Sequence, residues 1–328
     1  MNALVRIKAD LLQTYTNLRG WRTRRKLVVI ESDDWGAMRL PGSIAYGKMR
    51  EAGIGLDMSS YDRLDCLEHR DDFQALMNVI DAHRDFAGRP ATFTFNTVMG
   101  NPDFEAIEKN SFQSFYHQPF FDSYRYYNDE DLEQEWRSAI DAGLIRPQFH
   151  AREHLNSRLW MDDLRAGHEE TRLAFNYRFY AHSTRTGSPR QNNYLCAYWP
   201  ESLDDLAQIE VILQDGLNQF NDTFGFRSVS FVGCNYVWPQ ALECCLSELG
   251  VKLLQSQRAH RQPDPRQGGV TGVRRHYTGQ KNRYGQYFSV RNVLFEPYLD
   301  QNTDWAARAL AEISQSFRLN RPAIICSH

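Results

Sequence analysis

An adjacent pair of carboxylates, Asp33 and Asp34, follows the apolar run 27–30. Three other adjacent aspartate pairs lack such a run before them, at 71–72, 162–163 and 204–205. A buried strand that carries carboxylates at its C-terminal end is where α/β folds keep their sites, and carboxylate oxygens suit hard divalent cations. The pair at 33–34 therefore indicates metal chemistry.

Imidazoles follow two further strand candidates. His150 and His154 come after 145–149, and His328 comes after 323–326. If a helix begins at His150, the spacing of four residues puts both imidazoles on one face, where they can hold one ion. The spacing alone is weak evidence, because a chain with ten histidines contains such a pair by chance about 0.3 times. Two unrelated surface features remain an alternative, and His328 reads equally well as a frayed terminus.

One aspartate and two histidines make a three-ligand set with positions left for water, as hydrolytic zinc sites require. The remaining carboxylate is then available as a base, and a separate histidine as an acid. This division of roles predicts metal-assisted hydrolysis of an amide or an ester.

The elements that must position these residues alternate along the chain. Strand candidates lie at 27–30, 91–95, 145–149, 228–232, 251–254, 288–290 and 323–326. Helical patterns lie between them, at 71–83, 129–142, 203–220, 239–249 and 303–317. Such alternation predicts a parallel α/β sheet or barrel, in which the carboxyl ends of the strands share one mouth.

The chain is predicted to form a single α/β domain over 26–328, preceded by an N-terminal helix and basic segment at 1–25. Two stretches interrupt the alternation: 100–128 is rich in Phe and Tyr, and 258–283 is polar. Long loops in a compact domain are usually functional or mobile. We therefore expect both stretches to be insertions around a cleft mouth.

Composition excludes several classes of protein. A hydrophobic content of 42% and an aromatic content of 13% exclude a disordered chain. A net charge of −3 gives no basic field that would indicate nucleic acid. The sequence has no run of about 18 apolar residues to span a bilayer and no secretory signal, so a soluble, cytoplasmic protein is predicted.

The N-terminal helix leaves two roles open. Apolar residues at helical spacing between Leu4 and Tyr15, followed by a basic cluster at 22–26, suit a peripheral membrane helix. A helix packed on its own domain explains the same amphipathicity and is the favoured reading. The six cysteines show neither metal-type spacing nor the density of a disulfide scaffold, so they are predicted to be reduced thiols in the core.

At these residues the chain resembles the polysaccharide deacetylase superfamily, the NodB-homology domains of carbohydrate esterase family 4. The family motif S/T-F-D-D-G is similar to 31–36 (ESDDWG), the motif H-S/T-x-x-H to 150–154 (HAREH), and the final strand with L-x-H to 324–328 (IICSH). The resemblance implies a distorted (β/α)7-type barrel and removal of an N- or O-linked acetyl group from a carbohydrate or glycoconjugate by metal-activated water.

The resemblance also implies roles for individual residues. Asp33 would be the catalytic base and His328 the acid. Asp34, His150 and His154 would hold one divalent metal ion, with zinc expected ahead of cobalt, nickel or manganese. The backbone N–H of Tyr236, in 233–236 (GCNY), would hold the oxyanion, because this is the best match to the family's R-x-P-Y motif.

Four departures from the family pattern bear on activity. Gly233 replaces the arginine that orients the base, Asn235 replaces a proline, Ala151 replaces a Ser or Thr, and Trp35 is inserted before the glycine. Arg291, which follows a strand candidate, is our candidate replacement for the missing arginine. Trp35 and Trp238 are candidate substrate contacts, because aromatic faces suit pyranose rings, although core packing explains either tryptophan equally well. Asn235 is a third candidate substrate contact.

The predicted function is therefore a metal-dependent deacetylase acting on an acetylated saccharide. Two alternatives remain open: a catalytically silent carbohydrate-binding relative, which the missing arginine favours, and an amidohydrolase acting on a non-sugar amide. Because the sequence stops at its proposed acid, we also expect the natural chain to extend beyond His328.

Overall fold

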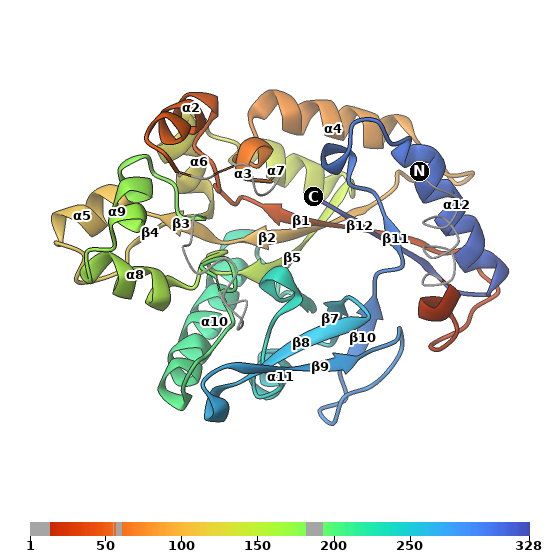
Figure 1. Cartoon of the computed structure of the whole chain (residues 1–328). Coiled ribbons are helices and arrows are strands. Elements are labelled where there is room, and N and C mark those ends of the chain that lie inside the picture. The colour runs from red at the N-terminus through yellow and green to blue at the C-terminus, as the bar shows by residue number, and fades with distance from the viewer. Residues whose placement is uncertain (1–13, 55, 57–60, 182–192) are drawn as a thin grey trace.

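The fold is taken from a computed structural model, which describes residues 14–54, 56, 61–181 and 193–328. Within that part an open sheet of eight parallel strands forms the centre, in the order β10-β7-β6-β5-β2-β1-β12-β11 (Figure 1). The strands are β1 (Val28–Trp35), β2 (Phe93–Val98), β5 (Ile145–Ala151), β6 (Ser230–Val232), β7 (Leu253–Ser256), β10 (Tyr287–Val290), β11 (Val293–Leu294) and β12 (Ala323–Ser327). The predicted α/β class with parallel strands is confirmed.

Strand β1 lies at the point in the sheet where the strand order reverses. The chain proceeds from β1 through β2, β5, β6 and β7 to β10 on one side, and then returns to pair β12 with the other side of β1. The strand order thus reverses at β1, and ligands in open α/β sheets bind outside the carboxyl ends of strands at such a point. All seven predicted strands are present, and the missed strand β11 is only two residues long.

Helices pack around the sheet. The helices that correspond to predicted ones are α4 (Arg70–Ala82), α7 (Glu133–Asp141), α10 (Leu203–Phe224), α11 (Leu242–Glu248) and α12 (Trp305–Arg318). These match the five predicted helices; α7 and α10 contact β5, and α12 contacts β11 and β12. Shorter helices are α2 (Ser43–Glu51), α3 (Tyr61–Leu64), α5 (Phe104–Lys109), α6 (Phe120–Asn128), α8 (Ser157–Arg165) and α9 (Glu169–Asn176). No helix among the described residues is long and apolar enough to cross a membrane.

Both stretches predicted as insertions leave the main sheet, but each has secondary structure of its own. The stretch 100–128 contains α5, α6 and the antiparallel pair β3 (Gly100–Pro102) and β4 (His117–Pro119). The stretch 258–283 contains a hairpin of β8 (Ala259–Asp264) and β9 (Val270–Arg275). The stretch 100–128 belongs to the core through its aromatic residues. Phe120 is 1% exposed and packs edge-on against the buried Trp136.

The N-terminal segment lies partly outside the described residues, which begin at 14, so the predicted amphipathic helix remains a prediction. The described part is held to the end of the domain by Arg321, whose guanidinium donates to the carbonyls of Asn17, Leu18 and Trp21. The described cysteines form no disulfide, although Cys66 is exposed and Cys244 and Cys245 are only half-buried. The prediction of core thiols therefore holds for Cys196, Cys234 and Cys326 alone.

Candidate active site

Asp33 sits near the end of β1 in a set of buried, mutually bonded polar groups. Arg291, directly after β10, donates to both of its oxygens, with Nη1 2.5 Å from Oδ2 and Nη2 2.7 Å from Oδ1. The Nδ2 of Asn96 donates to Oδ1 at 2.7 Å. Burial favours the neutral acid, but the Arg291 charge and hydrogen bonds outweigh it and lower the pKa of Asp33. Asp33 is therefore held as an oriented carboxylate.

The same guanidinium binds a second buried carboxylate. Arg291 Nε donates to Glu31 Oε2 at 2.7 Å, and both side chains are less than 4% exposed. For Glu31, burial outweighs the attraction of Arg291 and raises the pKa. The arginine of the R-x-P-Y motif, which is missing at Gly233, is thus matched in space by Arg291, from a strand end about sixty residues later.

The backbone at Asp34 explains how two consecutive aspartates face one cluster. Successive residues of a regular strand point to opposite faces. Here the pairing of β1 with β2 shifts register between Ser32 and Trp35, and Asp34 has φ of 66°. A left-handed residue other than glycine costs on the order of 1–3 kcal/mol and is found at functional sites. This irregularity brings both carboxylates to the carboxyl edge of the sheet.

Asp34 faces the two predicted histidines. Its Oδ1 lies 3.1 Å from His150 Nε2 and 3.4 Å from His154 Nε2, and its side chain is 7% exposed. Burial opposes its ionisation, but positive charge on His154 and His150 outweighs burial and lowers the pKa of Asp34 well below its usual range. The other oxygen, Oδ2, receives Arg39 Nη2 at 3.3 Å.

The contact between Asp34 and His150 is unfavourable unless a positive charge lies between the two side chains. His150 Nδ1 is 2.7 Å from the carbonyl oxygen of Val232, so Nδ1 carries a hydrogen and Nε2 faces the carboxylate. Among the described residues Asp34 Oδ1 has no partner with hydrogen-bond geometry. A buried acceptor 3.1 Å from a second acceptor requires a proton or a metal ion beside it. One carboxylate oxygen and two imidazole nitrogens are a donor set that fits zinc or a related divalent ion.

No helix begins at His150, so the condition for a shared helical face is not met, although the two imidazoles do come together. His150 lies within β5, His154 lies in the turn that follows, and helix α8 begins only at Ser157. The ring centroids are 5.1 Å apart. The turn, rather than a helical face, brings the second imidazole back towards the first.

His328 lies beside this pair of aspartates and is oriented by the carboxylate of Glu296, which was not among the predicted site residues. Its Nδ1 is 2.7 Å from Oε1 of Glu296, and its Nε2 is 3.9 Å from Asp33 Oδ2. Burial disfavours its charged form, but the Glu296 hydrogen bond and the charges of Asp34 and Asp33 outweigh burial and raise the pKa of His328. Glu296 follows β11, which is too short to show as a strand in the sequence.

Tyr236 does not provide the predicted backbone donor. Its N–H donates to the carbonyl of Gly233 at 2.7 Å, inside the 3-10 turn η1 (Cys234–Tyr236), so it is not available to an oxyanion. Its hydroxyl instead accepts from Arg291 Nη1 at 2.6 Å. Tyr236 thus takes part in the site by supporting the guanidinium on Asp33. Asn235 directs its amide to Cys196 Sγ at 3.5 Å rather than to the aspartates.

The two tryptophans predicted to bind sugar are packing residues in this structure. Trp238 is fully buried and lies against His260, with ring centroids 3.7 Å apart, so it offers no face to a ligand. Trp35 stacks on Phe95 at 3.6 Å and donates its indole N–H to Ser32 Oγ. Sequence pattern does not separate an exposed tryptophan from one that closes a core.

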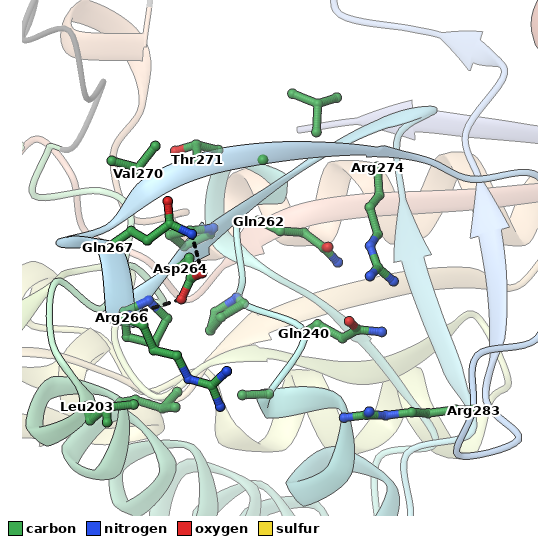
Figure 2. A pocket seen from close by; sticks show the side chains of 17 residues that line it. Leu203, Gln240, Gln262, Asp264, Arg266, Gln267, Val270, Thr271, Arg274 and Arg283 are labelled. Carbon is green, nitrogen blue, oxygen red and sulfur yellow. Dashed lines mark hydrogen bonds between the residues drawn. The ribbon is translucent and has the colours of Figure 1, made fainter.

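A cavity with a volume of about 720 Å³ lies away from the aspartates, under the β8–β9 hairpin. Figure 2 shows Arg266, Arg274 and Arg283 reaching into it beside Gln240 and Gln262. Its size suits a small ligand. None of the predicted site residues lines it, and its three arginines are exposed, unlike the buried groups around the aspartates.

Comparisons with known proteins give a resemblance in fold at very low identity. No family profile matches the sequence, and no curated protein matches it. Among solved structures, a candidate polysaccharide deacetylase from Mycobacterium smegmatis has a TM-score of 0.41 and 10% identity, covering 94% of this chain and 79% of its own. The PuuE allantoinase has a TM-score of 0.40 and 8% identity, with coverage of 94% and 78%. A polysaccharide deacetylase from Bacillus cereus has a TM-score of 0.35 and 8% identity, with coverage of 87% and 67%.

Polysaccharide deacetylases are thus among the solved structures that this fold resembles. The TM-scores are below 0.5 and the identities do not exceed 10%, so these likenesses carry no argument about activity. The functional argument rests on the chain's own residues.

Proposed function

We propose that this protein is a metal-dependent hydrolase that removes an acetyl group, N- or O-linked, from a carbohydrate or glycoconjugate, on a NodB-type (β/α)7-like scaffold. The observation that carries the proposal is the division between the two adjacent aspartates. Asp33 is bonded by Arg291 and Asn96, whereas Asp34 Oδ1 faces two imidazole nitrogens without a hydrogen-bond partner among the described residues.

Asp34, His150 and His154 would hold the ion, with zinc as the expected metal. A divalent ion held there supplies a Lewis acid that polarises a carbonyl and acidifies water. Three ligands from one protein leave coordination positions free, as hydrolytic sites require.

The chain's own groups move the protons. Asp33 remains ionised because Arg291 lowers its pKa, so it is ready to accept a proton from the attacking water. His328, with its Nδ1 fixed on Glu296 and its Nε2 directed towards Asp33, is the group that protonates the departing amine or alcohol. Its raised pKa keeps it protonated towards higher pH.

The silent-relative alternative depended on the missing motif arginine. Arg291 supplies a bidentate guanidinium to Asp33, which supports catalysis rather than binding alone. A binding site would also have no use for a carboxylate and an imidazole set as base and acid.

The test is release of acetate from acetylated saccharides by metal-loaded protein, with a non-sugar acetamide in parallel. We expect Asp34→Ala and His150→Ala to abolish release. Asp71→Ala, at an exposed member of another aspartate pair, should retain it. Equal activity in all four proteins would end the proposal. Saccharide binding without turnover would favour the silent relative, and turnover of the acetamide alone would favour an amidohydrolase.

A further inference from the structure

Cys234 lies against the two histidines of the candidate metal site. It is fully buried at the start of η1, one residue after Gly233 and two after the end of β6. Its Sγ and one ring nitrogen each of His150 and His154 all lie within 4.8 Å of one another. The same two imidazoles also face Asp34 Oδ1, at 3.1 and 3.4 Å. Side chains from the ends of β1 and β6 thus converge on two imidazoles that follow from β5.

The turn that delivers Cys234 requires a glycine before it. A Cβ on Gly233 would lie 2.5 Å from Cε3 of the buried Trp238 and 3.1 Å from the carbonyl oxygen of Val237. The turn is closed by the N–H of Tyr236 bonding to Gly233 and the N–H of Val237 bonding to Cys234. An arginine at 233 would not fit, so the departure from the motif and the placement of the thiol are two results of one tight turn.

Other buried thiols have different surroundings. Cys196 Sγ accepts from the amide of Asn235, and Cys326 Sγ lies 3.3 Å from Arg291 Nη1 and 3.2 Å from the Tyr236 hydroxyl. Neither belongs to the His150 and His154 group. Asp34 does not belong to the group of three, but its buried Oδ1 lies 3.1 and 3.4 Å from the same two imidazoles without a hydrogen-bond partner among the described residues, which is a separate sign that a cation binds beside them.

We propose that Cys234 is a thiolate ligand of the metal ion, in addition to Asp34, His150 and His154. This inference rests on the proposed function for the presence of the ion. A thiolate among nitrogen and oxygen ligands selects borderline-soft ions such as zinc or cobalt and disfavours manganese and magnesium. It also adds negative charge to the site, and with four protein ligands a water would bind only if the ion takes a fifth ligand.

The experiment is a titration of the metal-free full chain with Co²⁺, followed by absorption spectroscopy. A sulfur ligand gives a near-ultraviolet charge-transfer band, and the visible ligand-field bands report cobalt binding independently. We expect both in the wild type and in Cys196→Ser, a matched buried cysteine outside the group. Cys234→Ser should keep the ligand-field bands, lose the charge-transfer band and bind cobalt at least about tenfold more weakly.

X-ray absorption of the zinc-loaded wild type gives a readout that needs no variant and is unaffected if Cys234→Ser fails to fold. A sulfur neighbour at about 2.3 Å is expected, and only nitrogen and oxygen neighbours would overturn the inference. Cobalt binding without a charge-transfer band in the wild type would remove Cys234 as a ligand and leave the proposed function standing. A wild type that binds neither ion would overturn both.

Discussion

Asp33 and Asp34 are neighbours in the chain with opposite surroundings. Asp33 lies in a saturated network, in which Arg291, Asn96 and Gln255 donate and accept at distances between 2.5 and 2.9 Å. On the Asp34 side, an acceptor oxygen faces two imidazole nitrogens and has no hydrogen-bond partner among the described residues. Folding alone satisfies the first set of groups, whereas the second requires a proton on an imidazole or a bound cation to complete it.

This contrast assigns stability mainly to the Asp33 side and ion binding to the Asp34 side. A buried ion pair whose partners are all bonded is costly to break, since one charge is then left unpaired. A buried acceptor without a donor is itself a cost that an ion removes. Substitutions on the two sides should therefore fail in different ways.

Among changes that leave the proposed metal ligands in place, the largest effect on rate is expected from Asp33→Asn. Loss of a general base lowers hydrolysis by a factor of about 10² to 10⁴. Because Arg291 keeps its bond to Glu31, the fold and the metal content should be retained. Steady-state rates with metal analysis of the same samples test this, and a fall in rate that tracks loss of metal would contradict the separation of roles.

Arg291→Met should be the most destabilising of these changes. It leaves Glu31 and Asp33 buried without their cation, so the free energy of unfolding should fall by about 3–5 kcal/mol. Arg137→Met is the matched control, since its ion pair with Glu133 is exposed and should cost less than about 1 kcal/mol. Urea denaturation measures both, and equal losses would show that the Asp33 network adds no special stability.

Glu296→Gln should move the pH dependence of the rate. Glu296 helps to raise the pKa of His328, and a general acid must be protonated to act. Removing that carboxylate lowers the pKa, so activity should be lost at lower pH on the basic limb. Glu312→Gln, which removes a carboxylate bonded to the backbone of Leu294, should leave that limb in place. An unmoved basic limb in both variants would exclude His328 as the acid.

The smallest effect is expected in the cavity under the hairpin. Arg274→Gln lies at an exposed position outside both aspartate networks, so the free energy of unfolding should change by less than about 0.5 kcal/mol. The hydrolysis rate on a neutral acetylated saccharide should be unchanged. A marked loss of rate would extend the site into the hairpin cavity.

Most of the elements were predictable, because each strand is a short apolar run and each long helix has an amphipathic period. The same reasoning predicted that residues at the ends of β1, β5 and β12, and Arg291 after β10, lie close together, and they do. It missed Glu296, because β11 is too short to register as a strand. It also expected the backbone N–H of Tyr236 to be available to an oxyanion, whereas this N–H bonds to the carbonyl of Gly233.

What the sequence could not give depends on backbone geometry and burial. The internal hydrogen bond that occupies the Tyr236 N–H and the tight turn at Gly233 leave no pattern of residue types. The full burial of Trp238 is equally invisible, since exposed and buried tryptophans look alike in a sequence. The left-handed backbone at Asp34 lies where β1 shifts register against β2. Because the residue is not a glycine, the sequence does not mark this position.

The most direct test of the account is calorimetric titration of zinc into metal-free wild type, Asp33→Asn and Asp34→Asn. We predict that wild type and Asp33→Asn each bind one ion per chain with similar affinity. Asp34→Asn should bind at least about 100-fold more weakly, since it loses a ligand rather than a supporting contact. Equal affinities in all three proteins, or a loss confined to Asp33→Asn, would contradict the division of roles between the two aspartates.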